Sequence, residues 1–536
     1  MRTTRSILSL TISRPSKLFI NSYRHSSLES IATFRSTSLS SSSSSSSPFR
    51  ALVRSYRSTT TIHMAEQDET DNTTLSSTRA GRAVSLLPTY LTDARAVTKY
   101  CRSTAPDGAL QLSVAENQML EDLLCPALTE FSKSRATFPS DAIYYQPTHG
   151  RETLRQTMTQ YLKDLLDLDG EDNSNNNLDP EGIIIGAGCN AVLENLCVSL
   201  ADPGQGVMIP LPYYAAFEFD LGSRAGLKVV PVPTMGYSGS SSDESISPPC
   251  EAYYLTRAAL DAAKNKSMHE HGVEPRILLI SHPQNPLGIC YPPHVIKETI
   301  DWCRENKIHL ISDEIYAGSI YRKESADFSS ALKIASSSSS SSSEKGLGLG
   351  PYVHLVYALS KDFALSGLRV GVMYSENQEI RLPVQKLNDL CSVSSQTQLL
   401  VEDLLKAESS SSSTSTLSLS WTNEFLSENQ RRIRQRGDAW QSCLNELNIP
   451  HLDGTAGLFC WMDLSQFLPE EGTPDERERT LYLELLNDYG LLFTPGQSMK
   501  SELPGFFRCV FTAASDHEFV LGMERLKAYV QKKREE

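Results

Sequence analysis

Lys361 is placed in a short polar loop between two apolar runs, and this position could make its amine reactive. Residues 352–359 and 368–374 are rich in tyrosine, valine and leucine, and each run predicts a buried strand. A lysine between buried strands loses hydration, so its pKa falls and the neutral amine becomes a nucleophile able to form an imine. The alternative is an ordinary solvated lysine in a surface loop.

Two further polar side chains follow predicted strands. Asn285 comes soon after the apolar run 276–280, and Asp313 comes two residues after the end of the run 309–311. The carboxyl ends of parallel strands meet at one edge of a sheet, so we expect Asn285, Asp313 and Lys361 to converge. Neighbouring strand residues point to opposite faces, which disfavours Asp313 and Glu314 as a metal-binding or acid–base pair.

An anion could bind where residues 183–190 run from an apolar strand through Gly186 and Gly188 into a predicted helix over 191–200. A glycine turn at a helix start aims backbone N–H groups and the positive helix end at one point, which suits a phosphate. A purely structural turn is the alternative.

Near the C-terminus, Arg508 lies within the apolar run 506–511. An isolated buried guanidinium is costly unless it is paired, so an anionic partner is expected, and an internal salt bridge is the alternative to a bound anion.

The elements that must position these groups alternate between short apolar strands and helices over residues 183–374, which predicts an α/β domain with a largely parallel sheet. Residues 421–536 predict a second domain with helices over 423–447 and 477–489 and strands over 458–464, 491–493 and 506–511. The expected organisation is a targeting or disordered segment 1–63, a linker 64–84, an N-terminal segment 85–145 that packs with the smaller domain, a large domain 146–400 with low-complexity loops, and a small domain 401–536.

The segment Ser360-Lys-x-Phe-x-x-x-Gly-x-Arg-x-Gly371 and the turn Asn285-Pro-x-Gly288 resemble the class I/II pyridoxal 5′-phosphate (PLP) aminotransferases. Within that family the chain is most similar to the 1-aminocyclopropane-1-carboxylate (ACC) synthases. The resemblance implies PLP fold type I, a large α/β domain with a smaller α+β domain, and PLP held by Lys361 as an imine.

The resemblance also implies a role for each matching residue. Gly188, Cys189 and Arg369 would hold the cofactor phosphate, and Ser360 would bind the cofactor. Tyr214 would stack on the ring, Asn285 and Tyr316 would bind its phenolic oxygen, and Asp313 would pair with the ring nitrogen. Arg508 would bind the substrate α-carboxylate, and Glu116 of Ala115-Glu-Asn-Gln118 would approach the substrate. Tyr145 would reach the cofactor phosphate of a neighbouring subunit in a homodimer.

Two departures from the family pattern bear on the reaction. The first concerns the motif Tyr145-x-x-x-x-Gly150: ACC synthases place a functional tyrosine two residues before this glycine, where this chain has Thr148. The second is Ala358, where relatives have a serine. The expected function is therefore a PLP-dependent aminotransferase acting on an L-amino acid and a 2-oxo acid. The alternatives are an ACC synthase acting on S-adenosylmethionine and a non-catalytic PLP-binding or scaffold protein.

Composition adds limits on location and partners. Residues 1–63 hold eight arginines and one lysine against a single glutamate, a net charge of +8. Because the whole chain has a net charge of −14, residues 64–536 have a net charge of −22. The basic, serine-rich start predicts a transit peptide, mitochondrial in the first instance, with a plastid or a cytosolic form starting at Met64 as alternatives. The acidic remainder argues against nucleic acid, and no apolar run reaches the roughly 18 residues of a membrane span.

The histidines and cysteines give no metal motif. His269 and His271 flank Glu270 in what the sequence suggests is a polar loop, and without a second ligand cluster a solvated surface is expected. Eleven cysteines without a Cys-x-x-Cys pair indicate reduced thiols rather than a disulfide framework or a zinc site.

Overall fold

The computed structural model describes residues 77–135, 137–168, 178–236, 248–337, 347–406 and 421–536. The predicted targeting segment 1–63 lies outside these residues, as do the serine runs 40–47 and 409–413 and most of the run 336–343. Within the predicted linker 64–84, the described part forms most of helix α2 (Thr78–Ser85), which Ser77 caps through a side-chain hydrogen bond. The other domain boundaries stay predictions.

A mostly parallel seven-stranded sheet forms the centre of the described chain, which confirms the predicted α/β class. The strand order is β2-β8-β7-β6-β5-β3-β4, in which β7, β6, β5, β3 and β4 are mutually parallel and β8 is antiparallel to both β7 and β2. The strands are β2 (Ile183–Gly186), β3 (Gly206–Pro210), β4 (Lys228–Val232), β5 (Pro275–Ser281), β6 (His309–Asp313), β7 (Val353–Ala358) and β8 (Gly371–Ser375).

Helices cover both faces of this sheet, so successive strand residues enter different cores. In β5, Ile277 and Leu279 pack on the face covered by α6, α7 and α12, whereas Leu278 and Ile280 pack on the opposite face. Burial on both faces explains the continuous apolar runs in the sequence. The helices of this region are α5 (Glu152–Leu165), α6 (Cys189–Leu200), α7 (Phe217–Gly222), α8 (Arg257–His271), α9 (Pro293–Asn306), α10 (Ala331–Ser337), α11 (Leu359–Asp362), α12 (Gln378–Leu387) and α13 (Ser395–Lys406).

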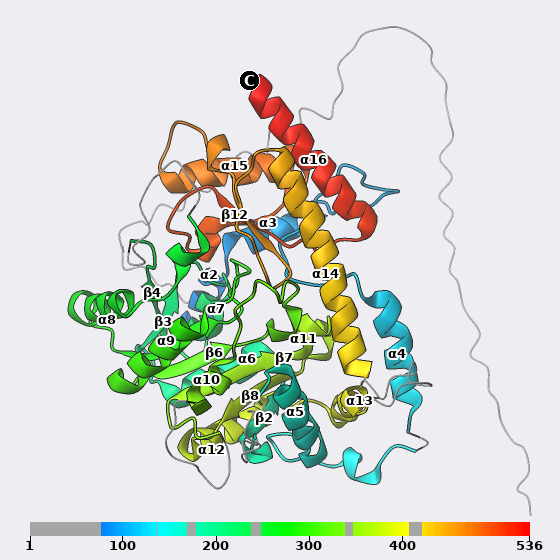
Figure 1. Cartoon of the computed structure of the whole chain (residues 1–536), viewed down its shortest axis with the longest axis vertical. Coiled ribbons are helices and arrows are strands. Elements are labelled where there is room, and N and C mark those ends of the chain that lie inside the picture. Colours follow the sequence, from blue (N-terminus) through cyan, green and yellow to red (C-terminus); the bar gives the residue numbers. More distant parts are fainter. Residues whose placement is uncertain (1–76, 136, 169–177, 237–247, 338–346, 407–420) are drawn as a thin grey trace, which may run out of the picture. The chain divides into compact units, whose positions relative to one another are not determined.

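The C-terminal part builds a separate core around a three-stranded antiparallel sheet, β11-β12-β9. The N-terminal part adds strand β1, which pairs in parallel with β10 through Leu110 and Leu491. Helix α14 runs from the neighbourhood of α13 to α16 at the other end (Figure 1). The remaining elements are α3 (Thr89–Ala96), β1 (Leu110–Gln111), α4 (Glu121–Lys133), α14 (Trp421–Glu446), β9 (Cys460–Asp463), α15 (Pro474–Tyr489), β10 (Leu491–Leu492), β11 (Thr494–Pro495), β12 (Phe506–Cys509) and α16 (Asp516–Glu535).

Two local predictions were wrong. The strand predicted from residue 368 begins only at Gly371, because residues 366–368 form a 3-10 turn and Arg369 adopts a left-handed backbone with φ 53°. His269 and His271 lie in the last turn of α8 rather than in a loop, since Thr256 caps the start of this helix and Gly272 ends it. No His, Cys, Asp and Glu cluster able to hold a metal ion occurs among the described residues.

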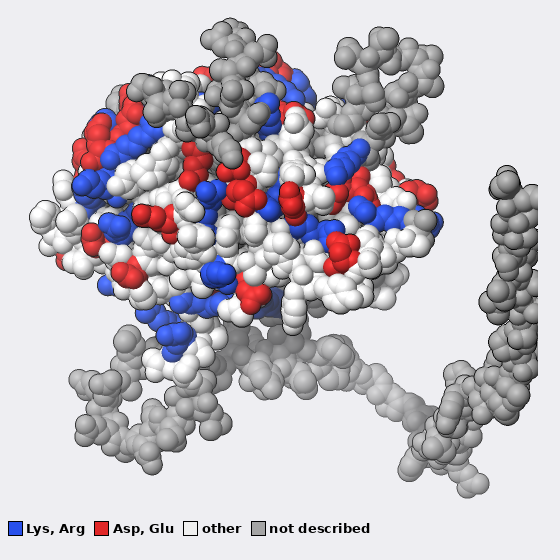
Figure 2. Space-filling view, turned by 90° about the horizontal axis from the view of Figure 1, so that it is seen from below, with Lys and Arg blue, Asp and Glu red and all other residues white. Residues whose placement is uncertain are grey.

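Two features of the described residues concern possible partners: the apolar character of the helices and the charge distribution on the surface. No helix within the described ranges is long and apolar enough to cross a membrane. Figure 2 shows one face of the molecule, on which basic and acidic side chains are interspersed rather than gathered into a basic patch. Among the described residues of that face, Figure 2 shows no continuous positive surface of the kind that nucleic-acid backbones require.

Candidate active site

One cavity of about 190 Å³ gathers nine of the residues that the sequence singled out. The strand-end residues converge there because the parallel register places Ser281 of β5 opposite Asp313 of β6, and Asp313 opposite Val356 of β7. Three chain segments distant in sequence thus end at the same edge of the sheet. The nine residues are Cys189, Tyr214, Asn285, Asp313, Tyr316, Ser360, Lys361, Arg369 and Arg508.

Lys361 points into this cavity from the short helix α11 that follows β7. Its Nζ donates a 2.5 Å hydrogen bond to the backbone oxygen of Ala115. Burial, followed by repulsion from the Arg508 guanidinium, lowers the pKa of Lys361 from 10.5 to about 8. A substantial fraction of the amine is therefore neutral near physiological pH, as a nucleophile requires.

Asp313 is buried at the end of β6 and lacks a cationic partner within hydrogen-bonding distance. Its Oδ1 accepts only a long 3.3 Å bond from the Ile315 N–H, and burial raises the pKa of Asp313 to about 7. Glu314 turns the other way and accepts hydrogen bonds from the Ser312 hydroxyl and the Ala331 N–H. The two carboxylates do not converge, as predicted, and a protonated ring nitrogen would supply the partner that Asp313 lacks.

The glycine turn before α6 and the loop after α11 form a tight cradle. Gly188 has φ +94°, and a Cβ built on it would lie 2.3 Å from Nη2 of Arg369. A Cβ on Gly371 would lie 2.3 Å from the backbone carbon of Gly188. No side chain caps the start of α6, so its first N–H groups stay available beside the arginine. This arrangement suits a phosphate bound by a helix N-terminus and a guanidinium.

Arg508 crosses from β12 into the cavity and makes no salt bridge in the described chain, so the internal ion pair considered above was wrong. Its Nη1 donates to Oδ1 of Asn285 at 2.7 Å, and its Nη2 donates to the Ser113 carbonyl at 2.6 Å and to the Thr494 hydroxyl at 3.2 Å. The buried Nε has no partner. A fully buried cation satisfied only by neutral oxygens is a strong site for a carboxylate.

Two tyrosines border the cavity in edge-on aromatic contacts. The ring of Tyr214 meets Phe217 at a centroid distance of 5.3 Å, and the ring of Tyr316 meets Phe459 at the same distance. Burial raises the pKa of both phenols. Their hydroxyl groups therefore stay protonated and can donate hydrogen bonds.

Three other predicted residues lie outside the cavity lining. Gly188 belongs to the cradle through its contact with Arg369. Glu116 lies beside the cavity, where its Oε1 accepts a 3.4 Å hydrogen bond from the hydroxyl of the cavity residue Ser366. Tyr145 is not brought together with the others: its side chain is exposed and lines a separate hollow with Thr148. Its predicted role in a neighbouring subunit stays a prediction.

The sequence reasoning missed two ionisable residues of the cavity lining. Tyr90 of α3 lines the cavity, and its phenol lies within electrostatic range of Arg508. Asp220 of α7 also lines the cavity, both its oxygens accept 2.9 Å bonds from Asn190 Nδ2, and burial raises its pKa to about 6. Neither residue belongs to a recognisable motif, although Asp220 comes six residues after Tyr214.

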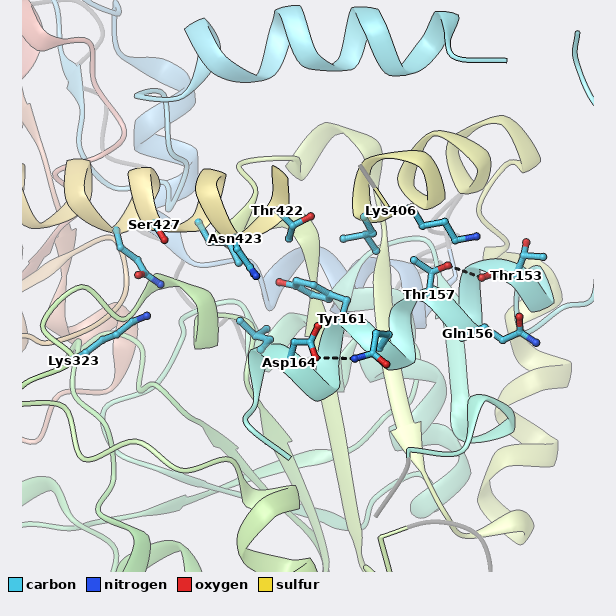
Figure 3. Close-up of a pocket in the computed structure, with 15 residues that line it drawn as sticks. Thr153, Gln156, Thr157, Tyr161, Asp164, Lys323, Lys406, Thr422, Asn423 and Ser427 are labelled. Atoms are coloured by element: carbon cyan, nitrogen blue, oxygen red, sulfur yellow. Dashed lines mark hydrogen bonds between the residues drawn. The ribbon is translucent and has the colours of Figure 1, made fainter. Parts of the chain in front are cut away.

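A larger cavity of about 700 Å³ lies elsewhere, between α5 and α14 (Figure 3). Figure 3 shows Thr153, Thr157 and Tyr161 of α5 on one side and Thr422, Asn423 and Ser427 of α14 on the other. Its two lysines, Lys323 and Lys406, lie at opposite ends in this view. None of the residues that converge at the strand ends lines it, so we place the chemistry in the smaller cavity.

Known proteins match this chain over most of its length. The sequence profile of the family described as aminotransferase class I and II matches residues 109–521. The 1-aminocyclopropane-1-carboxylate synthase 11 of Arabidopsis thaliana is 31% identical over 430 residues, 79% of this chain and 84% of that protein. The synthase 7 of the same plant is 32% identical over 443 residues, 81% of this chain and 90% of that protein.

Solved structures match the fold at lower identity. The Pyrococcus protein-A1 structure has a TM-score of 0.64 at 18% identity and covers 85% of this chain and 99% of its own. A Thermus thermophilus aspartate aminotransferase double mutant has a TM-score of 0.60 at 18% identity and covers 85% of this chain and 97% of its own.

Proposed function

Because the chain belongs to the class I and II aminotransferase family, we propose that it transfers the amino group of an L-amino acid to a 2-oxo acid. Members of this family are enzymes that use PLP. The observation that carries the proposal is the single cavity in which the amine of Lys361, the carboxylate of Asp313 and the guanidinium of Arg508 meet. These are the groups needed to hold a carbonyl cofactor and an amino acid together.

The described residues fit PLP at three independent points. The cradle of Gly188, Arg369 and the uncapped start of α6 fits a phosphate, and the unpaired buried Asp313 fits a protonated pyridine nitrogen. The Arg508 Nη1 bond to Oδ1 of Asn285 turns the amide nitrogen of Asn285 away from the arginine, where it can donate to a phenolic oxygen. When bound, PLP supplies an electron sink for the charge that develops at the substrate α-carbon.

The protein's own groups then divide the work. Lys361 Nζ, with its lowered pKa, is the base that removes the α-proton and the acid that returns it. Arg508 holds the substrate carboxylate by a planar two-bond contact and so fixes which bond at the α-carbon faces the cofactor ring. Asp313 keeps the proton on the ring nitrogen.

Position 148 is the reason for placing amino transfer first. The tyrosine that ACC synthases carry there is replaced by Thr148, a half-buried residue without a phenol, whose backbone oxygen accepts a hydrogen bond from Asn388. A threonine at this position cannot supply the aromatic hydroxyl at the same reach. Tyr145, in contrast, keeps the spacing found in aminotransferases.

An ACC synthase acting on S-adenosylmethionine is the second candidate, and sequence similarity favours it. The relatives at 31% and 32% identity carry that name, whereas the likeness to aspartate aminotransferases, at 18% identity, shows only the fold. The segment Ala115-Glu-Asn-Gln118, which resembles the corresponding ACC synthase segment, also contacts Lys361 directly.

The two candidates predict different products from one preparation. The full-length protein is incubated with PLP and a panel of L-amino acids and 2-oxo acids, and in parallel with S-adenosylmethionine. We expect keto acid formation that depends on both an amino acid and an oxo acid. Release of 1-aminocyclopropane-1-carboxylate as the main product would overturn this ranking, while activity in neither assay would reject both candidates.

We further propose a homodimer in which Tyr145 serves the partner's cavity. The side chains of Ile143, Tyr144 and Tyr145 are exposed in the single chain, beside the hollow that Thr148 lines. Consecutive exposed apolar side chains are typical of an interface. Light scattering tests this proposal: a monomeric mass at micromolar concentration would reject it.

A further inference from the structure

A row of polar side chains on one face of α14 connects this helix to the N-terminal segment and to the C-terminal part of the chain. Asn429, Arg432 and Arg436 follow one another at spacings of three and four residues, so they share a face of the helix. Arg432 Nη1 donates to the Met119 carbonyl, and Arg436 Nη1 donates to the Ala514 carbonyl at 2.6 Å. Of these three residues, Asn429 is the one that binds the backbone next to Lys361, at Asp362.

Both polar atoms of the Asn429 amide are used, although the residue is fully buried. Its Oδ1 accepts a 2.8 Å hydrogen bond from Nδ2 of Asn117, and its Nδ2 donates a 2.9 Å bond to the backbone oxygen of Asp362. Asn117 lies two residues after Ala115, and Asp362 directly follows Lys361. The amide therefore joins two segments that are far apart in the sequence.

Together with the bond from Lys361 to Ala115, these contacts close a ring. The ring runs from Lys361 Nζ to the Ala115 carbonyl, along the chain to Asn117, through the Asn429 amide to the Asp362 carbonyl, and back to Lys361. A closed ring of hydrogen bonds fixes the separation of the two segments, since neither segment can move without breaking a buried bond.

The other side of Asp362 is fixed separately. Its carboxylate accepts bonds from the Gly318 N–H at 2.8 Å, the Ser319 hydroxyl at 2.6 Å and the Tyr357 hydroxyl at 3.0 Å. Tyr357 in turn contacts the Tyr161 hydroxyl at 2.7 Å, and Tyr161 is the ring that borders the larger cavity in Figure 3. The Gly318, Ser319 and Tyr357 groups thus bind the Asp362 carboxylate. The backbone carbonyl of Asp362 accepts its side-chain hydrogen bond from Asn429.

We infer that Asn429 is a positioning residue, which holds the Lys361 amine at a fixed distance from the segment Ala115–Asn117 and keeps that amine shielded from water. It touches neither substrate nor cofactor and acts through the Asp362 carbonyl. The inference rests on the proposed role of Lys361 as the reacting amine. Misplacement of a reacting group by about 1 Å can reduce a rate by about 10²-fold, so a remote amide can matter to the reaction.

The test compares Asn429→Leu and Asn429→Asp with the matched control Asn445→Asp on the exposed face of the same helix. Leucine removes both hydrogen bonds without adding charge, whereas aspartate keeps the acceptor toward Asn117 and loses the donor toward Asp362. Competitive acetylation of the full-length, cofactor-free protein over pH 6–11, followed by peptide mass spectrometry, measures the pKa of Lys361, with exposed Lys323 as internal reference.

We expect Asn429→Leu to raise the pKa of Lys361 toward the ordinary lysine value, by about one unit, because the displaced amine is better hydrated. Asn429→Asp should raise it at least as much, because the new carboxylate also attracts the ammonium. We also expect kcat to fall by about ten- to a hundredfold with a smaller change in KM. The control variant should leave both quantities unchanged. Because acetylation needs neither cofactor nor substrate, its result is independent of which reaction the enzyme performs.

The inference would be overturned if the Asn429 variants lower the melting temperature but leave the Lys361 pKa and kcat as in the unmodified protein. That result would show a merely structural role. If Asn429→Leu does not fold, Asn117→Leu breaks the same bridge from outside α14 and must show the same rise in the Lys361 pKa. An unchanged Lys361 pKa in folded Asn117→Leu would equally overturn the inference.

Discussion

The Lys361 amine donates a 2.5 Å hydrogen bond to the backbone carbonyl of Ala115, a residue 246 positions away in the chain. This contact brings the reactive group of the α/β region against the N-terminal segment that carries Glu116. The carbonyl is a neutral acceptor, so it orients the amine without the strong pKa increase that a carboxylate partner would cause. The lysine can thus be held in place and still lose its proton easily.

Replacing the lysine tests the centre of the proposed site. We expect Lys361→Ala to abolish the cofactor-dependent absorbance band and to reduce activity by more than about 10³-fold, since the nucleophile and the proton carrier are both lost. The control is Lys323→Ala, which removes an exposed lysine at the larger cavity. A Lys361→Ala protein that keeps the band would contradict the assignment of the imine-forming lysine.

The adjacent carboxylates Asp313 and Glu314 provide a matched pair. Asp313→Asn should lower kcat by about 10²-fold or more while the cofactor stays bound, because an amide cannot hold the ring nitrogen protonated. Glu314→Gln should instead leave kcat and the absorbance spectrum unchanged, because the remaining amide oxygen can still accept from Ser312 and Ala331, which both donate to Oε1, and residue 314 does not line the cavity. Equal effects of both changes on kcat would argue against the assigned role of Asp313.

Arg508→Lys preserves the charge and removes the planar fork. We expect KM for the amino acid to rise by about ten- to a hundredfold, the range that corresponds to losing one charge-assisted hydrogen bond of about 1.5–3 kcal/mol. Steady-state kinetics measure this change, and Arg431→Lys, which alters an exposed arginine paired with Glu428, is the control. An unchanged KM would mean that another group binds the substrate carboxylate.

Burial of the Lys361 ammonium should appear in the pH dependence of stability. The folded-state pKa of about 8 lies below the ordinary 10.5, so the charged amine destabilises the cofactor-free protein fully below pH 8, and this penalty disappears as pH rises toward 10.5. Lys361→Met should therefore stabilise the cofactor-free protein at pH 7, by on the order of 2–3 kcal/mol, and lose this gain by pH 10.5. Urea unfolding at pH 7, 9 and 10.5 measures the difference, and a gain that does not change with pH would contradict the lowered pKa.

The sequence predicted the strand-end residues well because their positions follow from local pattern and general topology. Asn285, Asp313 and Lys361 each follow an apolar run, and parallel strands bring such ends together whatever the length of the connections. The resemblance to a family then proposed roles for residues such as Tyr214 and Arg508, which the structure places in the same cavity.

Other features have no local signal in the sequence. The Ala115 carbonyl is a backbone group present at every position, and Tyr90 reaches the cavity only because α3 lies beside it. The left-handed backbone at Arg369 was missed because an arginine rarely adopts it, and tertiary contacts with the Gly188 turn override that preference here. Such positions depend on long-range packing, which periodicity does not encode.

The antiparallel pairing of β7 with β8 has a consequence for folding. Because these strands are neighbours in both sheet and sequence, Lys361 and Arg369 are placed at the cavity by one short connection. Arg508, in contrast, must meet Asn285 across 223 residues. Closing a longer loop costs more chain entropy, so Lys361 and Arg369 can take up their relative positions before Arg508 meets Asn285. Lys361 and Arg369 are also synthesised well before Arg508, so this pair can form while the C-terminal part of the chain is still being made.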